Sequence, residues 1–289
     1  MGKKLCISVD GGGALGIGPL AFMCRLEQDL GKSLATVGQA FAGTSTGAII
    51  AGGLSEGKSG HDLFELYRKN LTTIFTKYAW YKRVQPTCPT YDNSNLKKLL
   101  KANFTGKVSE WKKPTFITTT YMNGPSVEKV WDTGDSVDKW FAILTSTAAP
   151  TYFDVIVENG KSYCDGGMWA NDPCMVLEAG LKNKKPTWDC KYLCFHTGMR
   201  TPNTESGNQT LLGWGEYIMS DWIARAGDSN YYELCANVGS ANVFRASPSN
   251  SKTIKMDDVS KSTTEKVIKI WEDYYDTVRN DVLKFVKEN

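Results

Sequence analysis

The sequence predicts a single α/β domain of three layers with a mainly parallel central sheet. Two segments near the N-terminus carry this prediction, because residues 5–30 and residues 37–51 each read as a strand, a glycine-rich turn and a helix. The third observation is size, since 289 residues with 41% hydrophobic content can bury one large core. We therefore expect one domain over residues 1–289, with its motifs in residues 5–200 and a helical region over residues 211–289.

The turn at residues 10–16 predicts a backbone cradle for an anion, because glycines leave the N–H groups uncovered near a helix N-terminus. Its G-x-G-x-x-G spacing matches the dinucleotide fingerprint, which would place an acidic residue at the end of the next strand. That strand instead ends in a turn that carries Ser45. The alternative, which we favour, makes Gly11, Gly12 and Gly13 an oxyanion hole, because adjacent parallel strands deliver their turns to one edge.

The second turn, Gly43-Thr44-Ser45-Thr46-Gly47, has the form of a nucleophile elbow. The chain must reverse sharply there, and side chains at Gly43 and Gly47 would collide with neighbouring backbone. Ser45 would project its hydroxyl beside a helix N-terminus, which favours a developing oxyanion. The competing interpretation is that the three hydroxyl residues merely cap the following helix.

A third segment, residues 61–83, predicts a helix with one broad apolar face and an aromatic, basic exit, Trp80-Tyr81-Lys82-Arg83. One interpretation of the exit is an interfacial lid at the headgroup level of a membrane. The plainer interpretation, which we prefer, is a core-packing helix followed by an aromatic loop.

The remaining elements follow from apolar runs and their breakers. We expect helices over residues 96–102, 136–148 and 211–227 and strands over residues 115–121, 161–164 and 190–195. Ser262-x-x-Glu265 predicts a capping box for a last helix. Its apolar stripe is expected to consist of Val267, Trp271, Tyr274, Val278, Val282 and Phe285.

Two routes could activate Ser45, whose hydroxyl is a poor nucleophile until a base takes its proton. Asp165 lies on a tight Asp165-Gly166-Gly167 turn after a strand, so the backbone holds its carboxylate. It could serve Ser45 directly as the base of a dyad. It could also orient His196, one of two histidines, in a Ser-Asp-His triad. Spacing leaves both routes open.

Composition narrows the function classes. The net charge of +3 is small, and no stretch interleaves dense Lys and Arg with aromatics, so we expect no nucleic acid partner. The eight cysteines form no Cys-x-x-Cys pair, so we expect reduced thiols and no metal. No apolar stretch is long enough for a transmembrane helix, and no signal peptide is evident. We therefore expect a cytosolic chain, peripheral at membranes where it meets lipid, with homo-oligomerisation left open.

Taken together, three ordered motifs resemble the patatin-like phospholipase family. They are Asp10-Gly11-Gly12-Gly13 with Gly16, Gly43-Thr44-Ser45-Thr46-Gly47, and Asp165-Gly166-Gly167. Supporting similarities in order and spacing are Tyr91-Asp92, residues 114–120, residues 148–153 and Asn171-Asp172-Pro173. The similarity spans about residues 5–200 and fades afterwards.

The resemblance implies a patatin-like fold and a lipid acyl hydrolase with a Ser45–Asp165 dyad and no cofactor or metal. It implies a phospholipid or other acyl-lipid substrate at a membrane surface and an acyl-enzyme that water releases. Two positions depart from the family: Leu15 stands where Arg or Lys is usual, and Asp172 where Asn is common. A non-catalytic lipid-binding or storage protein of the same fold remains an alternative.

Overall fold

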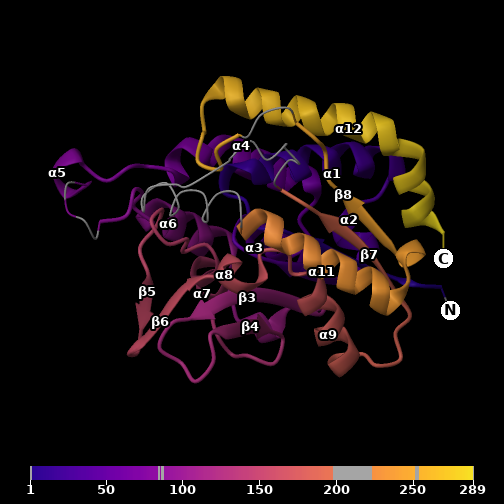
Figure 1. Ribbon diagram of the computed structural model, residues 1–289, viewed down its shortest axis with the longest axis horizontal. Helices are drawn as coiled ribbons and strands as arrows, with labels where there is room; N and C mark the ends of the chain where they lie inside the picture. The colour runs from indigo at the N-terminus through magenta and orange to yellow at the C-terminus, as the bar shows by residue number, and fades with distance from the viewer. Residues whose placement is uncertain (1, 84, 86–87, 198–222, 251–253, 289) are drawn as a thin grey trace, which may run out of the picture.

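The computed structural model describes residues 2–83, 85, 88–197, 223–250 and 254–288, and it confirms the α/β prediction (Figure 1). In this part of the chain eight strands form one sheet in the order β5-β6-β3-β2-β1-β7-β8, with β4 also paired to β3. The strands are β1 (Lys4–Val9), β2 (Ala40–Gly43), β3 (Thr115–Tyr121), β4 (Glu128–Asp132), β5 (Ile156–Glu158), β6 (Lys161–Asp165), β7 (Cys190–Phe195) and β8 (Val243–Ala246).

The sheet has a parallel half and an antiparallel half. β1 runs parallel to β2 and to β7, and the parallel pairing continues to β3 on one side and to β8 on the other. Beyond β3 the direction changes, because β4 and β6 pair antiparallel with β3, and β5 with β6. The predicted parallel pairing is therefore found in the half of the sheet that contains both glycine-rich turns, and the other half is antiparallel.

Helices cover both faces of the sheet, as the three-layer prediction requires. They are α1 (Ile17–Leu30), α2 (Leu34–Val37), α3 (Thr46–Ser55), α4 (Gly60–Ile74), α5 (Trp80–Arg83), α6 (Ser94–Asn103), α7 (Lys139–Ser146), α8 (Gly167–Ala170), α9 (Cys174–Lys184), α11 (Ile223–Val238) and α12 (Lys261–Lys287). Short 3₁₀ turns are η1 (Gly13–Gly16), η2 (Val108–Glu110) and η4 (Ser240–Asn242). None of these described helices combines the length and the apolar character that crossing a bilayer requires.

The alternation of side chains along β1 builds two cores. Leu5, Ile7 and Val9 join a large cluster with the buried faces of α1, α3, α4, α6, α7 and α12. Cys6 points to the opposite face, where a smaller cluster contains buried residues of α9 and α11. Each strand of the parallel half is thus covered on both sides, which suits a buried parallel sheet. All eight cysteines are free thiols.

The last helix packs on α1 through aromatic side chains. Phe22 lies between Trp271 and Tyr275, with ring centroids 6.1 Å and 4.9 Å away. Both of these rings are fully buried. Tyr274 is partly buried and packs against the same core, so the expected stripe is confirmed there, and Tyr275 is a buried position that the stripe did not include. Figure 1 shows α12 lying along α1 at the top of the molecule.

The expected start of this helix is wrong. Ser260 is the N-cap, because its hydroxyl accepts a hydrogen bond from the Thr263 N–H at 3.3 Å. Ser262 therefore lies in the first helical turn and is not the cap. The serine-rich run around it offered two competing cap positions, and sequence spacing alone does not choose between them.

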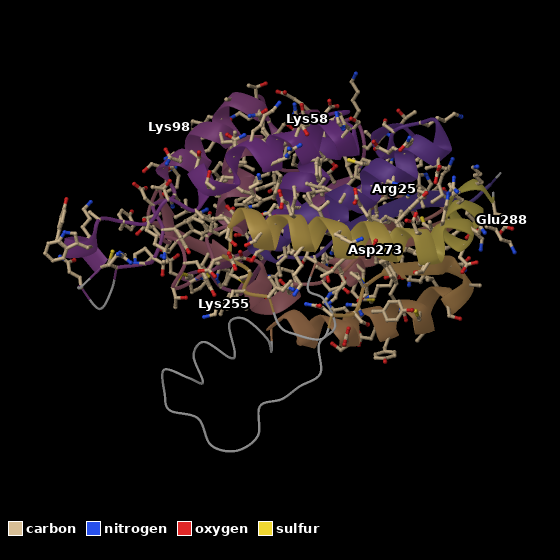
Figure 2. All side chains as sticks on the ribbon, turned by 90° about the horizontal axis from the view of Figure 1, so that it is seen from above. Arg25, Lys58, Lys98, Lys255, Asp273 and Glu288 are labelled. Carbon is tan, nitrogen blue, oxygen red and sulfur yellow. The ribbon has the colours of Figure 1, made fainter. Side chains whose placement is uncertain are left out.

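The segment over residues 61–83 divides into a core-packing helix, as expected, and an exposed exit. α4 buries Leu63, Tyr67, Leu71 and Ile74 in the core. α5 has no buried residue and stands away from the body of the molecule in both views (Figures 1 and 2). The helix expected over residues 211–227 falls mostly outside the described residues, and α11 is described from Ile223.

The contrast between buried and exposed tryptophans gives a stability test. Trp271→Ala should lower the free energy of unfolding by about 3–5 kcal/mol, because the fully buried ring leaves a cavity against α1. Trp80→Ala, at a side chain that is 74% exposed, should change it by less than about 0.5 kcal/mol. Urea unfolding of the two variants checks the prediction, which fails if their midpoints shift equally.

Candidate active site

The turn between β2 and α3 is a sharp, sterically restricted elbow. Ser45 has φ 54° and ψ −121°, a backbone conformation that non-glycine residues adopt at a cost of about 1–3 kcal/mol. A Cβ on Gly43 would lie 2.1 Å from the Gly47 carbonyl oxygen, and a Cβ on Gly47 would lie 2.0 Å from the Val9 carbonyl oxygen. The predicted reason for both glycines is therefore confirmed.

Ser45 occupies the N-cap position of α3 but makes no side-chain capping hydrogen bond. The capping interpretation is therefore wrong for Ser45. Its N–H donates to the Ser146 hydroxyl at 2.8 Å, and its hydroxyl is close enough to Asp165 to lower the pKa of that carboxyl group. Ser45 is half-buried between fully buried neighbours, so the hydroxyl lies where the elbow meets solvent.

The adjacent threonines hold the elbow from both sides. The Thr44 hydroxyl lies 2.6 Å from that of Thr118 on β3 and 2.6 Å from the carbonyl oxygen of Ala170 on α8. The Thr46 hydroxyl contacts the Tyr67 hydroxyl on α4. Each of these partners lies far away in the sequence, so local pattern could not reveal them.

Asp165 reaches Ser45 from the antiparallel half of the sheet. β3 pairs Ile117 with Gly43 of β2 and, two residues further on, pairs Thr119 with Asp165 of β6. The last residue of β6 therefore lies just beyond the end of β2, at the level of the elbow. The sequence predicted that the two side chains converge at one sheet edge, and the antiparallel direction of β6 is how they do so.

Backbone contacts fix the Asp165 carboxylate. Its N–H donates to the Ala148 carbonyl at 3.0 Å, and the Gly167 N–H donates to its Oδ1 at 2.7 Å. The side chain is only 5% exposed, and this burial raises its pKa to about 6, although the hydrogen bonds from Ser45 and Gly167 lower it. At neutral pH the group is thus mainly a carboxylate, and a stronger base than an ordinary Asp.

The glycine loop after β1 lies against the elbow. A Cβ on Gly11 would be 3.2 Å from the Ser45 Cβ, so the two turns meet directly. The Gly11 N–H, however, donates to the Asn171 carbonyl at 3.0 Å. This contact corrects the expectation for Gly11, whose N–H is already bonded. The N–H groups of Gly12 and Gly13 form no hydrogen bond with another described residue.

The other motif positions have close packing roles. A Cβ on Gly16 would lie 2.4 Å from the Thr46 hydroxyl, and one on Gly166 would lie 2.3 Å from the Thr118 hydroxyl. Leu15, at the position where the family usually has a cation, is buried in the large core. Asp10 belongs to a separate polar cluster with His196 and Arg245.

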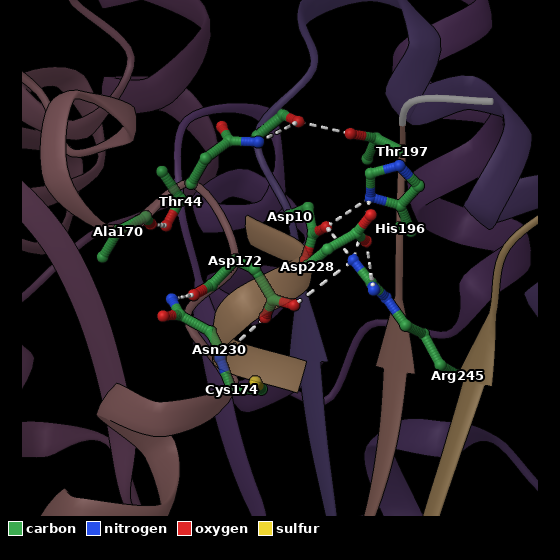
Figure 3. Close-up of polar contacts among 12 residues, drawn as sticks. Asp10, Thr44, Ala170, Asp172, Cys174, His196, Thr197, Asp228, Asn230 and Arg245 are labelled. Atoms are coloured by element: carbon green, nitrogen blue, oxygen red, sulfur yellow. Dashed lines mark hydrogen bonds and ion pairs between the residues drawn. The ribbon is translucent and has the colours of Figure 1, made fainter. Parts of the chain in front are cut away.

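This cluster surrounds the guanidinium of Arg245 on β8 (Figure 3). Its Nη1 lies 2.6 Å from Asp228, and its Nη2 lies 3.5 Å from Asp172 and 3.9 Å from Asp10. His196 places Nδ1 2.8 Å from the Asp10 carboxylate, so the histidine pairs with Asp10. Within the described residues, no group of three or more His, Cys, Asp or Glu side chains is arranged to hold a metal ion.

Burial dominates the electrostatics of the two inner carboxyl groups. It raises the pKa of Asp10 to about 8 and that of Asp172 to about 7, while Arg245 lowers both. For Asp172 the charge of Asp10 is the second cause of the rise. Sequence reasoning missed Arg245, which lies on β8 beyond the motifs and has no local signal.

The Asp172 pKa gives a test of stability against pH. A carboxyl group whose pKa is raised in the folded state contributes stability at low pH that is lost as the pH rises through about 7. Asp172→Asn removes this penalty and can keep the acceptor for the Cys174 N–H. From about pH 5 to about pH 9, the variant should gain about 3 kcal/mol of unfolding free energy relative to wild type.

Asp228→Asn is the matched control, because its side chain is 43% exposed and the other two carboxyl groups stay in place. It should show a smaller pH-dependent gain in urea unfolding, because burial is the largest cause of the raised pKa values and the charge of Asp228 is a lesser cause for Asp10. A decline of Asp172→Asn relative to wild type as the pH rises would contradict the prediction.

The chain is similar to proteins of one known family. A family model described as patatin-like phospholipase matches residues 7–178, a stretch that includes Ser45 and Asp165. Intracellular phospholipase A2 of Caenorhabditis elegans is 28% identical over 193 residues, which are 61% of this chain and 17% of that protein. The cGAMP-activated phospholipase of Vibrio cholerae is 28% identical over 204 residues, which are 59% of this chain and 55% of that protein.

The chain thus spans less than two thirds of the length of either relative. The crystal structure of VipD from Legionella pneumophila has the same fold, with a TM-score of 0.55 at 13% identity over 96% of this chain and 67% of that one. The family match includes the glycine loop and gives no support to the dinucleotide alternative. Because the matched residues make up more than half of the 289, the chain belongs to the patatin-like phospholipase family.

Proposed function

We propose that the chain is a lipid acyl hydrolase of the phospholipase A type, which cleaves fatty acyl esters of membrane lipids with Ser45 as nucleophile and Asp165 as general base. The observation that carries this proposal is that β3 places Asp165 at the level of the strained elbow, close enough to Ser45 for the serine hydroxyl to lower the pKa of the carboxyl group. The phospholipase names of the relatives support the substrate class.

In the first half-reaction, Asp165 takes the proton of the Ser45 hydroxyl while its oxygen attacks the acyl carbonyl carbon. The carbonyl oxygen becomes an oxyanion, and the N–H groups of Gly12 and Gly13 are the donors proposed to stabilise it. The proton then passes from Asp165 to the leaving alcohol oxygen. The products of this step are a lysolipid and an acyl ester on Ser45.

In the second half-reaction, the Asp165 carboxylate takes a proton from water, and the resulting hydroxide attacks the acyl ester. Collapse of the tetrahedral intermediate returns that proton to Ser45 and releases the fatty acid. One carboxylate thus serves both steps, which requires it to stay beside Ser45 throughout. The two backbone hydrogen bonds of Asp165, at its N–H and at Oδ1, support this requirement.

The contacts of His196 favour the dyad over the triad. The triad needs Asp165 to orient the histidine, whereas the contacts of the Asp165 carboxylate are with Ser45 and Gly167. His196 is paired with Asp10 instead. Its role in this proposal is therefore structural.

Substitution of these three residues separates the proposals. Ser45→Ala and Asp165→Asn should each lower kcat for fatty acid release by at least about 10³-fold with the fold intact. His196→Asn should keep most of the activity per folded molecule. A comparable loss in His196→Asn would favour the triad, and a wild-type protein that does not react with a fluorophosphonate probe would favour a lipid-binding role.

The raised pKa of Asp165 predicts the acid limb of the pH profile. The general base is active as a carboxylate, so kcat/KM on a soluble ester should fall as the pH drops through about 6. The same limb should persist in His196→Asn, because the dyad does not use the imidazole. A limb that moves or disappears in this variant would contradict the assignment of the base.

A further inference from the structure

Two aromatic side chains stand exposed on the segment that joins α4 to α6. We call residues 77–83 the α5 segment. Trp80 is 74% exposed and Tyr81 is 59% exposed. Figures 1 and 2 show α5 at the far left, away from the helices that cover the sheet. Exposing the apolar surface of two aromatic rings to water is unfavourable in free energy, and burial of the rings against another surface would remove this cost.

The charge of the α5 segment is of one sign. Lys77, Lys82 and Arg83 are all exposed, and the segment contains no acidic residue. The Lys82 Nζ lies 5.2 Å from the centre of the Tyr78 ring, so cation and aromatic side chains are interleaved. Interleaved aromatic and basic side chains are typical of surfaces that rest at the headgroup level of an anionic bilayer.

Hydrogen bonds hold the first residues of the α5 segment, Lys77 and Tyr78, in place. Lys77 forms an antiparallel bridge with Tyr91, and the Tyr78 N–H donates to the Thr90 carbonyl at 3.1 Å. The Tyr78 hydroxyl donates to the Asp154 carboxylate at 2.5 Å. The exposed pair is thus carried by a fixed support and has a defined position on the molecule.

This support is connected to the active site on one side through residues 148–154. The N–H groups of Thr90 and Tyr91 donate to the carbonyls of Thr151 and Tyr152 at 3.0 Å and 2.8 Å. The same stretch begins at Ala148, whose carbonyl accepts the Asp165 N–H. Hydrogen bonds therefore join the support of the α5 segment to the stretch that holds Asp165.

A second connection runs to the glycine loop. The Tyr91 hydroxyl donates to the Asp257 carboxylate at 2.8 Å. The neighbouring Met256 carbonyl accepts the Ala14 N–H at 2.7 Å. The α5 segment is thus linked to both sides of the site, the Asp165 turn and the oxyanion loop.

We propose that the α5 segment docks the protein on an anionic lipid bilayer, with Trp80 and Tyr81 at the headgroup level and Lys77, Lys82 and Arg83 facing lipid phosphates. This inference rests on the proposed function, because a bilayer is the source of the substrate. It adds which surface faces the membrane and which lipid charge is preferred. The exclusively basic charge of the segment favours an anionic bilayer over an apolar protein groove.

Vesicle binding can be tested without turnover. In a Ser45→Ala background, sedimentation with vesicles of equimolar phosphatidylcholine and phosphatidylglycerol should show binding that weakens with salt and with pure phosphatidylcholine. Lys82→Gln with Arg83→Gln should weaken it about 30-fold, at about 1 kcal/mol per cation. Trp80→Ala with Tyr81→Ala should weaken it at least about tenfold.

Matched controls remove similar side chains elsewhere. Tyr232→Ala on α11 removes an aromatic ring that is 69% exposed, and Lys269→Gln with Lys284→Gln removes two exposed cations from α12. Both controls should bind vesicles like the parent. Equal binding by the α5 variants and their controls would overturn the proposal. Trp80 and Tyr81 would then be assigned to a contact with a protein partner.

A turnover experiment separates this proposal from the proposed function. With Ser45 restored, Trp80→Ala with Tyr81→Ala should lose at least about tenfold in fatty acid release from anionic vesicles but hydrolyse a soluble short-chain ester at the wild-type rate. An unchanged rate on vesicles would overturn the docking surface and leave the function standing. Vesicle binding through α5 without any ester hydrolysis by wild type would refute the function alone.

Discussion

The site depends on a steric constraint at the end of β2. The chain turns from strand to helix within two residues, and this turn requires Ser45 to take a positive φ and both flanking glycines to lack a Cβ. Without a Cβ, Gly47 can approach the backbone of β1, and the elbow can lie directly beside the glycine loop. The energy stored in this turn is offset by the buried threonine contacts and by the core packing of α3.

A second constraint is the change of strand direction at β3. The parallel strands β1 and β2 bring the two glycine-rich turns together, as parallel topology generally does. Asp165 lies at the end of β6, which runs antiparallel to β3. The pairing of Asp165 with Thr119 sets the position of its carboxylate along the sheet. A shift of one residue in that pairing would turn the carboxylate to the opposite face of the sheet. The register of β6 is therefore as important to the site as the identity of its last residue.

Much of this arrangement could be predicted because its signals are local. The strand, the glycine spacing and the helix at residues 37–51 lie within one short stretch, so the sequence contains the geometry of the elbow. The Gly11 N–H bond to Asn171, the pairing of His196 with Asp10 and the role of Arg245 depend on contacts between distant segments. Spacing carries no information about such contacts. The misplaced cap of α12 has a simpler cause, since Ser260 and Ser262 are equivalent by residue type.

The two buried carboxyl groups under the glycine loop show how the position of Asp172 changes the local electrostatics. An Asn there would leave Asp10 as the inner partner of Arg245, whereas Asp172 adds a second buried acid. The exposed α5 segment is a separate feature of the surface. Hydrogen bonds from its first residues connect it to the same site.

The central claim is that Ser45 carries the acyl group between the two half-reactions. Rapid quenching of wild type and Asp165→Asn with a short-chain ester, followed by mass spectrometry of the peptide containing Ser45, tests it most directly. The account predicts an acyl adduct on Ser45 in wild type and far less in the variant, which lacks the base. An adduct on another residue, or full acylation of Ser45 without the Asp165 carboxylate, would contradict it.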